Sequence, residues 1–273
     1  LRDAAHLLTN ILFEGADPGR LKIGLIPFAA TVNVGTQHER AWWLDPNALS
    51  PLHSENFIPA ANRWDVFDTI TNRDWSGCVE ARAIPHDIED TPPNAASPGT
   101  LFLPYFATVN SGISAMIASG TTNIPIGVSW GVRVLSPGEP FTEGVAWGED
   151  DTIKAMVVLT DGENYLNGRS NSNYSDYSGY GYMRDGRLGI VSSNDSTIRN
   201  ALNARTAAAC EYAKTLGIRV YTITFQVNSS STRNMMQACA THPGLYFDSP
   251  SSDALRDAFE MIAGDLTNLR LSR

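Results

Sequence analysis

The stretch Ala155-Met-Val-Val-Leu-Thr-Asp-Gly-Glu-Asn164 constrains the fold more than any other part of the chain. Residues 156–159 are an apolar run, which is typical of a strand buried on both faces of a parallel sheet. The run ends abruptly in Thr160 and Asp161. Because α/β folds bind ligands beyond the carboxyl ends of their strands, Asp161 would lie where a hard cation such as Mg²⁺ or Ca²⁺ can bind.

Apolar strands and amphipathic helices alternate along much of the chain. Further strands are expected at 22–28, 218–227 and 245–247. Helical spacing of apolar residues occurs at 1–12, 109–117, 123–134, 198–216, 233–240 and 255–269. This alternation predicts an α/β fold, with a mostly parallel, doubly wound sheet that carries helices on both faces.

Two segments, about 36–104 and 165–197, are irregular and too long for simple loops. We interpret residues 1–273 as a single domain that carries these segments as insertions. The first insertion contains Trp42, Trp43, Trp64 and Trp75, which predict either a satellite core or a surface that binds a partner. The second contains five of the nine tyrosines. Its composition suits an adaptable contact loop, with a disordered polar loop as the alternative.

Composition excludes several functions. The formal net charge is −9 and no basic stripe is present, so nucleic acid is not expected as a partner. No run reaches the roughly 18 apolar residues that a membrane span needs. The five histidines are scattered, and the chain lacks a Gly-x-Ser-x-Gly motif and a glycine-rich phosphate loop. We therefore do not expect an enzyme, and a metal-dependent hydrolase is the weakest hypothesis because it would need a nucleophile or base beside the metal.

Several segments occur in the same order as in a known family. The chain resembles the von Willebrand factor type A (vWA) domains, which have a Rossmann-like fold, and more closely the TadG-like proteins of bacterial Tad (Flp-type) pilus systems. The segments that carry this resemblance are residues 26–35, 75–82, 103–106, 122–131, 135–137, 159–164 and 269–272.

The resemblance implies a metal-ion-dependent adhesion site. Thr122 matches the threonine of that site and Asp161 its aspartate. In the family the site also uses an Asp-x-Ser-x-Ser loop after the first strand. This loop is missing here, and segments 74–78 and 176–180 match it only in part. We expect this loop and the first strand to lie upstream of Leu1, since the chain also opens inside a helical pattern with no capping residue. Without that loop, Thr122 and Asp161 would bind Mg²⁺ or Ca²⁺ weakly.

The same residues have simpler interpretations. Asp161 and Gly162 are also typical of an ordinary turn at a strand end. Thr122 and Asn123 are also typical helix-capping residues. We expect residues 163 and 164 to be solvated rather than to bind metal.

The resemblance implies that the protein is exported, and this affects what is expected of its three cysteines. An exported protein allows a Cys210–Cys239 disulfide between the helices that flank the strand at 218–227, with two buried thiols as the alternative. Cys78 is then left over, either buried or paired with another chain.

The leading hypothesis that the resemblance implies is a non-enzymatic module for protein–protein interaction or adhesion. It would be exported or associated with the bacterial envelope (periplasm, cell surface or exterior) and linked to Tad-type pilus assembly or attachment. Its partners would be pilus components or surface proteins, and a membrane anchor could precede Leu1. The alternative is a structural or assembly subunit with an incomplete metal site.

Overall fold

The computed structural model describes residues 2–14, 21–38, 41–44, 77–82, 84–90 and 120–271. At its centre, β3 (Ala155–Thr160), β4 (Arg219–Phe225) and β5 (Tyr246–Ser249) form a sheet in the order β3-β4-β5. Both pairings are parallel, and Thr160 at the end of β3 lies opposite Thr224. The three strands therefore end at one edge of the sheet, which we call the carboxyl rim.

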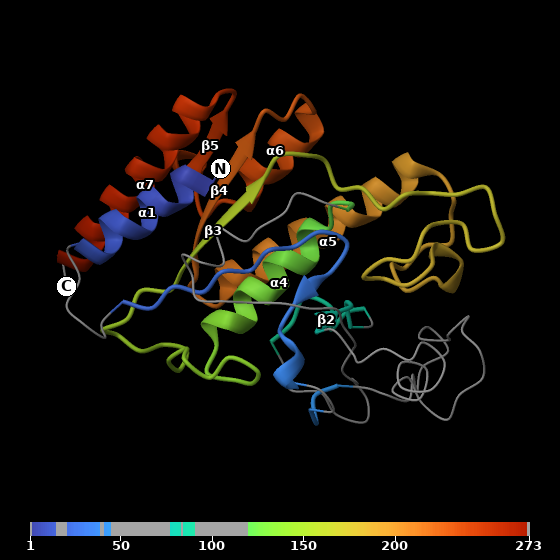
Figure 1. Cartoon of the computed structure of the whole chain (residues 1–273), viewed down its shortest axis with the longest axis horizontal. Helices are drawn as coiled ribbons and strands as arrows, with labels where there is room; N and C mark the ends of the chain where they lie inside the picture. Colours follow the sequence, from blue (N-terminus) through green and yellow to red (C-terminus); the bar gives the residue numbers. More distant parts are fainter. Residues whose placement is uncertain are drawn as a thin grey trace.

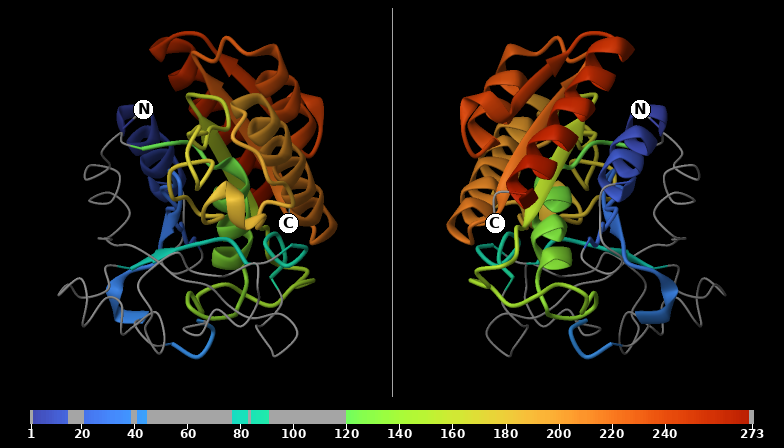
Figure 2. Two further views of the ribbon diagram at one scale, coloured as in Figure 1. Left: turned by 90° about the vertical axis from the view of Figure 1, so that its right-hand side faces the viewer. Right: turned by 90° about the vertical axis from the view of Figure 1, so that its left-hand side faces the viewer.

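Helices cover both faces of this sheet (Figures 1 and 2). On one face lie α4 (Ile124–Leu135), α5 (Asp195–Thr215) and α6 (Ser230–Cys239). The chain passes through α5 between β3 and β4, and through α6 between β4 and β5. On the other face α1 (Arg2–Glu14) and α7 (Ser252–Leu271) lie side by side.

The strand side chains alternate between these two layers, as the pleat of a strand requires. Met156, Val158 and Val220 pack against α4, α5 and α6. Val157 and Ile223 pack in the cluster that contains α1 and α7. This arrangement confirms the predicted α/β class, with a parallel sheet covered on both faces.

A further core lies under the irregular segments. It joins buried residues of both predicted insertions to the outer surfaces of α4 and α5, and includes Trp43, Trp130, Tyr180, Met183 and Leu202. The short antiparallel strands β1 (Val32–Asn33) and β2 (Cys78–Val79) belong to the same region. In the described part of the chain, the 3₁₀ helices are η1 (Thr36–His38), η4 (Met183–Asp185) and, elsewhere, η5 (Pro243–Leu245).

Helix boundaries follow from local chemistry. Asn194 Oδ1 accepts from the Thr197 N–H at 3.0 Å, and Ser229 Oγ accepts from the Thr232 N–H at 3.3 Å, so each side chain caps a helix start. Gly217 follows α5 with a φ of 77°, a conformation that favours glycine and is common just after a helix.

The strand predicted at 22–28 is wrong. These residues carry no strand, and only Phe28 pairs, through a single antiparallel bridge to Val32. Pro27 has no N–H to donate to a ladder, and the segment runs over α4, where Phe28 packs beside Gly127. The described residues do not include the helix predicted at 109–117. They also do not include Trp64 and Trp75.

Within the described residues, no helix has both the length and the apolarity to cross a bilayer.

Candidate functional site

The turn after β3 presents Asp161 at the carboxyl rim. The Thr160 hydroxyl donates to the Gly162 carbonyl at 2.9 Å and accepts from the Gly162 N–H at 3.3 Å. These bonds hold the chain in a tight turn, in which Thr160 is buried and Asp161 is exposed.

The structure places Thr122 beside this turn. Thr122 and Tyr165 form an antiparallel bridge, with N–H to carbonyl distances of 3.0 and 2.8 Å. A Cβ atom added to Gly162 would lie 3.8 Å from the Thr122 hydroxyl oxygen. Thr122 and the turn that carries Asp161 therefore meet at one edge of the sheet, and metal binding by these residues stays a prediction.

The donors at this rim fit a hard cation only in part. Asp161 offers a carboxylate and Thr122 a hydroxyl, which are the oxygen ligands that Mg²⁺ and Ca²⁺ take. Glu163 is held in an ion pair with Arg199 at 2.9 Å. Among the described residues, no group of three or more His, Cys, Asp or Glu is placed to hold a metal. Water or a partner's carboxylate would have to complete the shell.

Asn123, next to Thr122, carries an unsatisfied acceptor. The side chain is fully buried, and its amide donates to the Ala30 carbonyl at 3.0 Å. No donor within the described part of the chain reaches its Oδ1. A buried acceptor of this kind needs a water, an ion or another donor. Asn123 also does not cap α4 through its side chain, contrary to the capping interpretation.

The prediction that Asn164 is solvated is wrong, because its side chain is fully buried. Its Oδ1 accepts from the Ile124 N–H at 2.8 Å and so caps α4. Its amide donates at 3.0 Å to both Asn203 and Thr206 of α5. This one side chain therefore ties the turn after β3 to two helices and fixes the position of Asp161.

We expect Asn164→Ala to lower the free energy of unfolding by about 1–3 kcal/mol, because it leaves the buried Ile124 N–H without its acceptor and removes the amide that donates to Asn203 and Thr206. Urea unfolding followed by circular dichroism measures this. Asn200→Ala, on the exposed side of α5, is the matched control and should have no effect. An Asn164→Ala variant as stable as this control would contradict the assigned role.

The segment after the turn is an ordered loop that begins beside the rim, where Tyr165 pairs with Thr122, and that exposes several tyrosines. Tyr165, Tyr174 and Tyr177 are exposed. Backbone hydrogen bonds cross the loop, for example from the Arg169 N–H to the Tyr174 carbonyl at 2.9 Å. Buried Tyr180 anchors it to the further core. These observations favour the contact loop over the disordered alternative.

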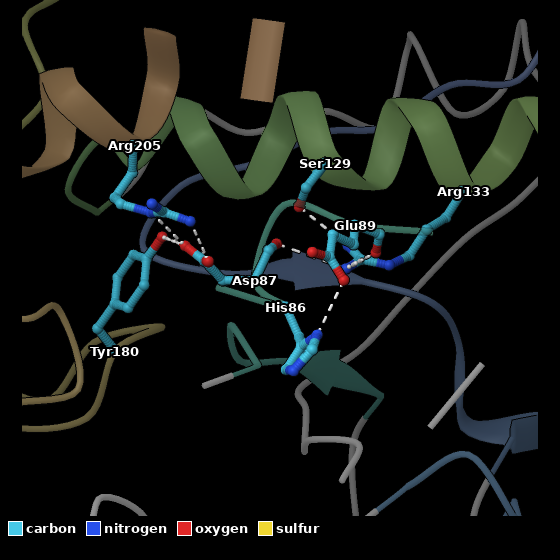
Figure 3. A network of polar contacts seen from close by, with 7 residues as sticks. All are labelled: His86, Asp87, Glu89, Ser129, Arg133, Tyr180 and Arg205. Atoms are coloured by element: carbon cyan, nitrogen blue, oxygen red, sulfur yellow. Dashed lines mark hydrogen bonds and ion pairs between the residues drawn. The ribbon is translucent and has the colours of Figure 1, made fainter. Parts of the chain in front are cut away.

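A buried ionic cluster fixes this loop to the first predicted insertion (Figure 3). The Asp87 side chain is fully buried and forms a two-pronged ion pair with Arg205 of α5. The Tyr180 hydroxyl donates to Asp87 Oδ2 at 3.0 Å, and burial raises the pKa of Tyr180 well above its usual value. Beside this cluster, buried Arg187 pairs with Glu80 at 2.6 Å.

Arg133 of α4 also binds the segment that carries Asp87. Its guanidinium donates to the carbonyls of Asp87 and Glu89, at 3.4 and 2.9 Å, and to the Ser129 hydroxyl at 2.9 Å (Figure 3). Burial, reinforced by the positive charge of Arg82, lowers the pKa of Arg133 to about 10. Sequence spacing does not reveal this cluster, because its members come from four distant segments.

The Cys210–Cys239 disulfide is present and joins α5 to α6, with 5.1 Å between the Cα atoms. The prediction of this bridge is confirmed. Disulfides form and persist in oxidising surroundings such as the periplasm and the cell surface. The side chain of Cys78 lies outside the described residues.

Comparison with known proteins gives a distant likeness. No family model matches the chain, and neither does any curated protein. Two crystal structures of the pilus adhesin SpaC from Lactobacillus rhamnosus GG, one in an open conformation, are similar to it at 21% identity, with TM-scores of 0.38 and 0.37. The match covers 57% of this chain and 20% of SpaC, so the chain spans about a fifth of that protein. A likeness at this level carries no argument about function.

Proposed function

We propose that this chain is a non-enzymatic interaction module that holds a protein partner at the carboxyl rim of its sheet. The meeting of Thr122 with the turn that carries Asp161 is the observation that supports this most. The resemblance of the sequence to vWA and TadG-like proteins adds an exported or envelope-associated location and a link to Tad-type pilus assembly or attachment. The Cys210–Cys239 bridge fits such a location.

A divalent cation would join the two surfaces. Mg²⁺ or Ca²⁺ would take oxygens from Asp161 and Thr122, and an acidic side chain of the partner would fill a further position. Asn123 Oδ1, buried next to Thr122, would then accept from an ordered water.

The tyrosine loop would supply specificity. Tyr165 follows the same turn as Asp161 and, like Tyr174, exposes its ring. Tyrosine gives a large contact area at a small entropic cost and is enriched at interface hot spots. Because Asp87 and Tyr180 hold the loop in one conformation, binding would require little further ordering.

A structural or assembly subunit without metal is the second candidate. It is favoured by the small number of hard donors that the described residues bring to the rim. In that case the tyrosine loop alone would bind the partner.

We expect Asp161→Ala to abolish cation-dependent partner binding without changing stability, because this carboxylate is exposed. The immobilised protein is exposed to envelope extract of its source bacterium in Mg²⁺, in Ca²⁺ and in EDTA, and retained proteins are identified by mass spectrometry. Asp176→Ala removes an exposed carboxylate from the tyrosine loop and is the matched control.

Retention that EDTA and Asp161→Ala both remove, and Asp176→Ala does not, supports the cation-dependent module. Retention that survives EDTA but is lost in Tyr174→Ala supports the structural subunit. If no protein is retained, or if all variants retain the same proteins under every condition, both proposals are wrong.

A further inference from the structure

A cavity of about 320 Å³ lies beside α4, away from the carboxyl rim. Segments 42–43, 79–82, 126–133 and 136–140 contribute to its walls. Neither Thr122 nor any residue of the turn at 160–165 lines the cavity, so rim and cavity are separate sites.

Four of the chain's six tryptophans line this cavity; the other two lie outside the described residues. The four are Trp42, Trp43, Trp130 and Trp147. These residues come from three separate segments, so the fold and not their spacing in the sequence brings the four indoles together.

The indoles form a fixed base and a more accessible wall. Trp43 and Trp130 belong to the further core and are 7% and 5% exposed. Their ring centres are 6.2 Å apart in an edge-to-face contact, which holds both rings in place. Trp42 is 62% exposed and Trp147 is half-buried. The Trp42 indole is itself held by its hydrogen bond to Glu139, so a ligand can reach indole surface that is already fixed in position.

Three charged residues of the lining, Glu80, Glu139 and Arg133, already have hydrogen-bond or ion-pair partners within the protein. Glu80 pairs with Arg187, and Glu139 accepts from the Trp42 indole at 2.9 Å. Arg133 is held by backbone carbonyls. Lys154 is not in the lining, but its ammonium lies 3.6 Å from the centre of the Trp147 ring. A ligand with a net charge would gain little here, because it would have to break these contacts.

A neutral ligand with hydroxyl groups would gain more. Arg82 and Arg133 are donors in the lining, and the carboxylates of Glu80, Asp90 and Glu139 have lone pairs that can accept further hydrogen bonds beside their existing contacts. Hydroxyl groups both donate and accept, so they can bond to either kind. The flat indoles would pack against an apolar ring face. A pyranose ring has this combination, with C–H groups on its faces and hydroxyls around its edge.

We infer that this cavity, which we call the tryptophan pocket, binds a neutral saccharide of one or two rings. The size agrees, since about 320 Å³ is near the lower limit of small-molecule pockets. The site does not depend on the rim cation, so the chain would have two independent binding sites.

The test is a titration of the protein with neutral saccharides, followed by intrinsic tryptophan fluorescence and calorimetry. The probes are glucose, galactose, mannose, N-acetylglucosamine, lactose and cellobiose. We expect saturable binding of at least one, with a changed emission spectrum. Trp42→Ala and Trp147→Ala should each weaken that binding about tenfold or more.

Three controls separate this site from the rim and from misfolding. Tyr174→Ala removes an exposed aromatic ring outside the pocket and should leave saccharide binding unchanged. Asp161→Ala and EDTA should also leave it unchanged, so failure of the rim proposal would not affect this result. Trp42 is exposed, so its replacement should preserve the fold, and thermal unfolding checks this for both tryptophan variants.

Three results would overturn the inference. The first is that no probe binds saturably. The second is that folded Trp42→Ala and Trp147→Ala proteins bind as tightly as the wild type. The third is that glucuronic acid or glucosamine binds more tightly than every neutral probe, because the pocket would then select for charge.

Discussion

Asp87→Asn is expected to lower the free energy of unfolding by about 3–5 kcal/mol, the cost of breaking a buried ion pair by removing one partner. The Asp87 side chain is fully buried, and that of Arg205 is only 17% exposed. Asparagine keeps the shape, and its one oxygen can still accept from Tyr180, but its amide then faces an Arg205 N–H, so the variant removes the charge together with one hydrogen bond from Arg205. The remaining Arg205 guanidinium would be desolvated without a counter-charge.

Urea unfolding of the variant and the wild type measures this effect. Asp176→Asn is the matched control, because it breaks an ion pair whose two side chains are about half exposed. It should leave the unfolding free energy unchanged within error. If Asp87→Asn were no more costly than Asp176→Asn, the ionic cluster would not brace the tyrosine loop.

Removing the disulfide is expected to have the next largest effect. Cys210 and Cys239 are 29 residues apart, and closing a loop of this length restricts the unfolded chain enough to stabilise the fold by about 3–4 kcal/mol. The double variant Cys210→Ala/Cys239→Ala should lose that amount and become insensitive to reductant. Both sulfurs are buried between α5 and α6, so some of the loss would come from packing.

The measurement compares the unfolding of the two proteins with and without dithiothreitol. The wild type in reductant should approach the double variant, which should not respond. A wild type whose unfolding midpoint is the same with and without reductant would contradict the prediction.

The sequence predicted the elements whose local signals and burial agree. Residues 156–159 form an apolar run and lie in the buried strand β3. The helical spacings at 123–134 and 198–216 correspond to α4 and α5. The pattern at 22–28 was misleading, because apolar residues that pack on α4 have the same composition as a short strand.

The site was predictable only where sequence neighbours form it. Asp161 is presented by its own turn, and the resemblance supplied Thr122. Asn164 was misjudged because sequence does not show that its side chain points inward between α4 and α5. The Asp87 cluster was missed because Arg205 is 118 residues away and Tyr180 is 93 residues away.

One sequence signal did mark that cluster. Six ionisable residues occur between positions 80 and 90, within an insertion rich in aromatic residues: Glu80, Arg82, His86, Asp87, Glu89 and Asp90. Such a density of charge next to apolar segments indicates either a solvated turn or a buried network, and only the fold separates the two.

The account depends most on cation binding at the carboxyl rim, and calorimetric titration of the natural protein with MgCl₂ and CaCl₂ tests this directly. The account predicts saturable binding of one cation, absent in Asp161→Ala, weakened in Thr122→Ala and unchanged in Asp176→Ala. A silent titration, or identical binding by the wild type and Asp161→Ala, would contradict it.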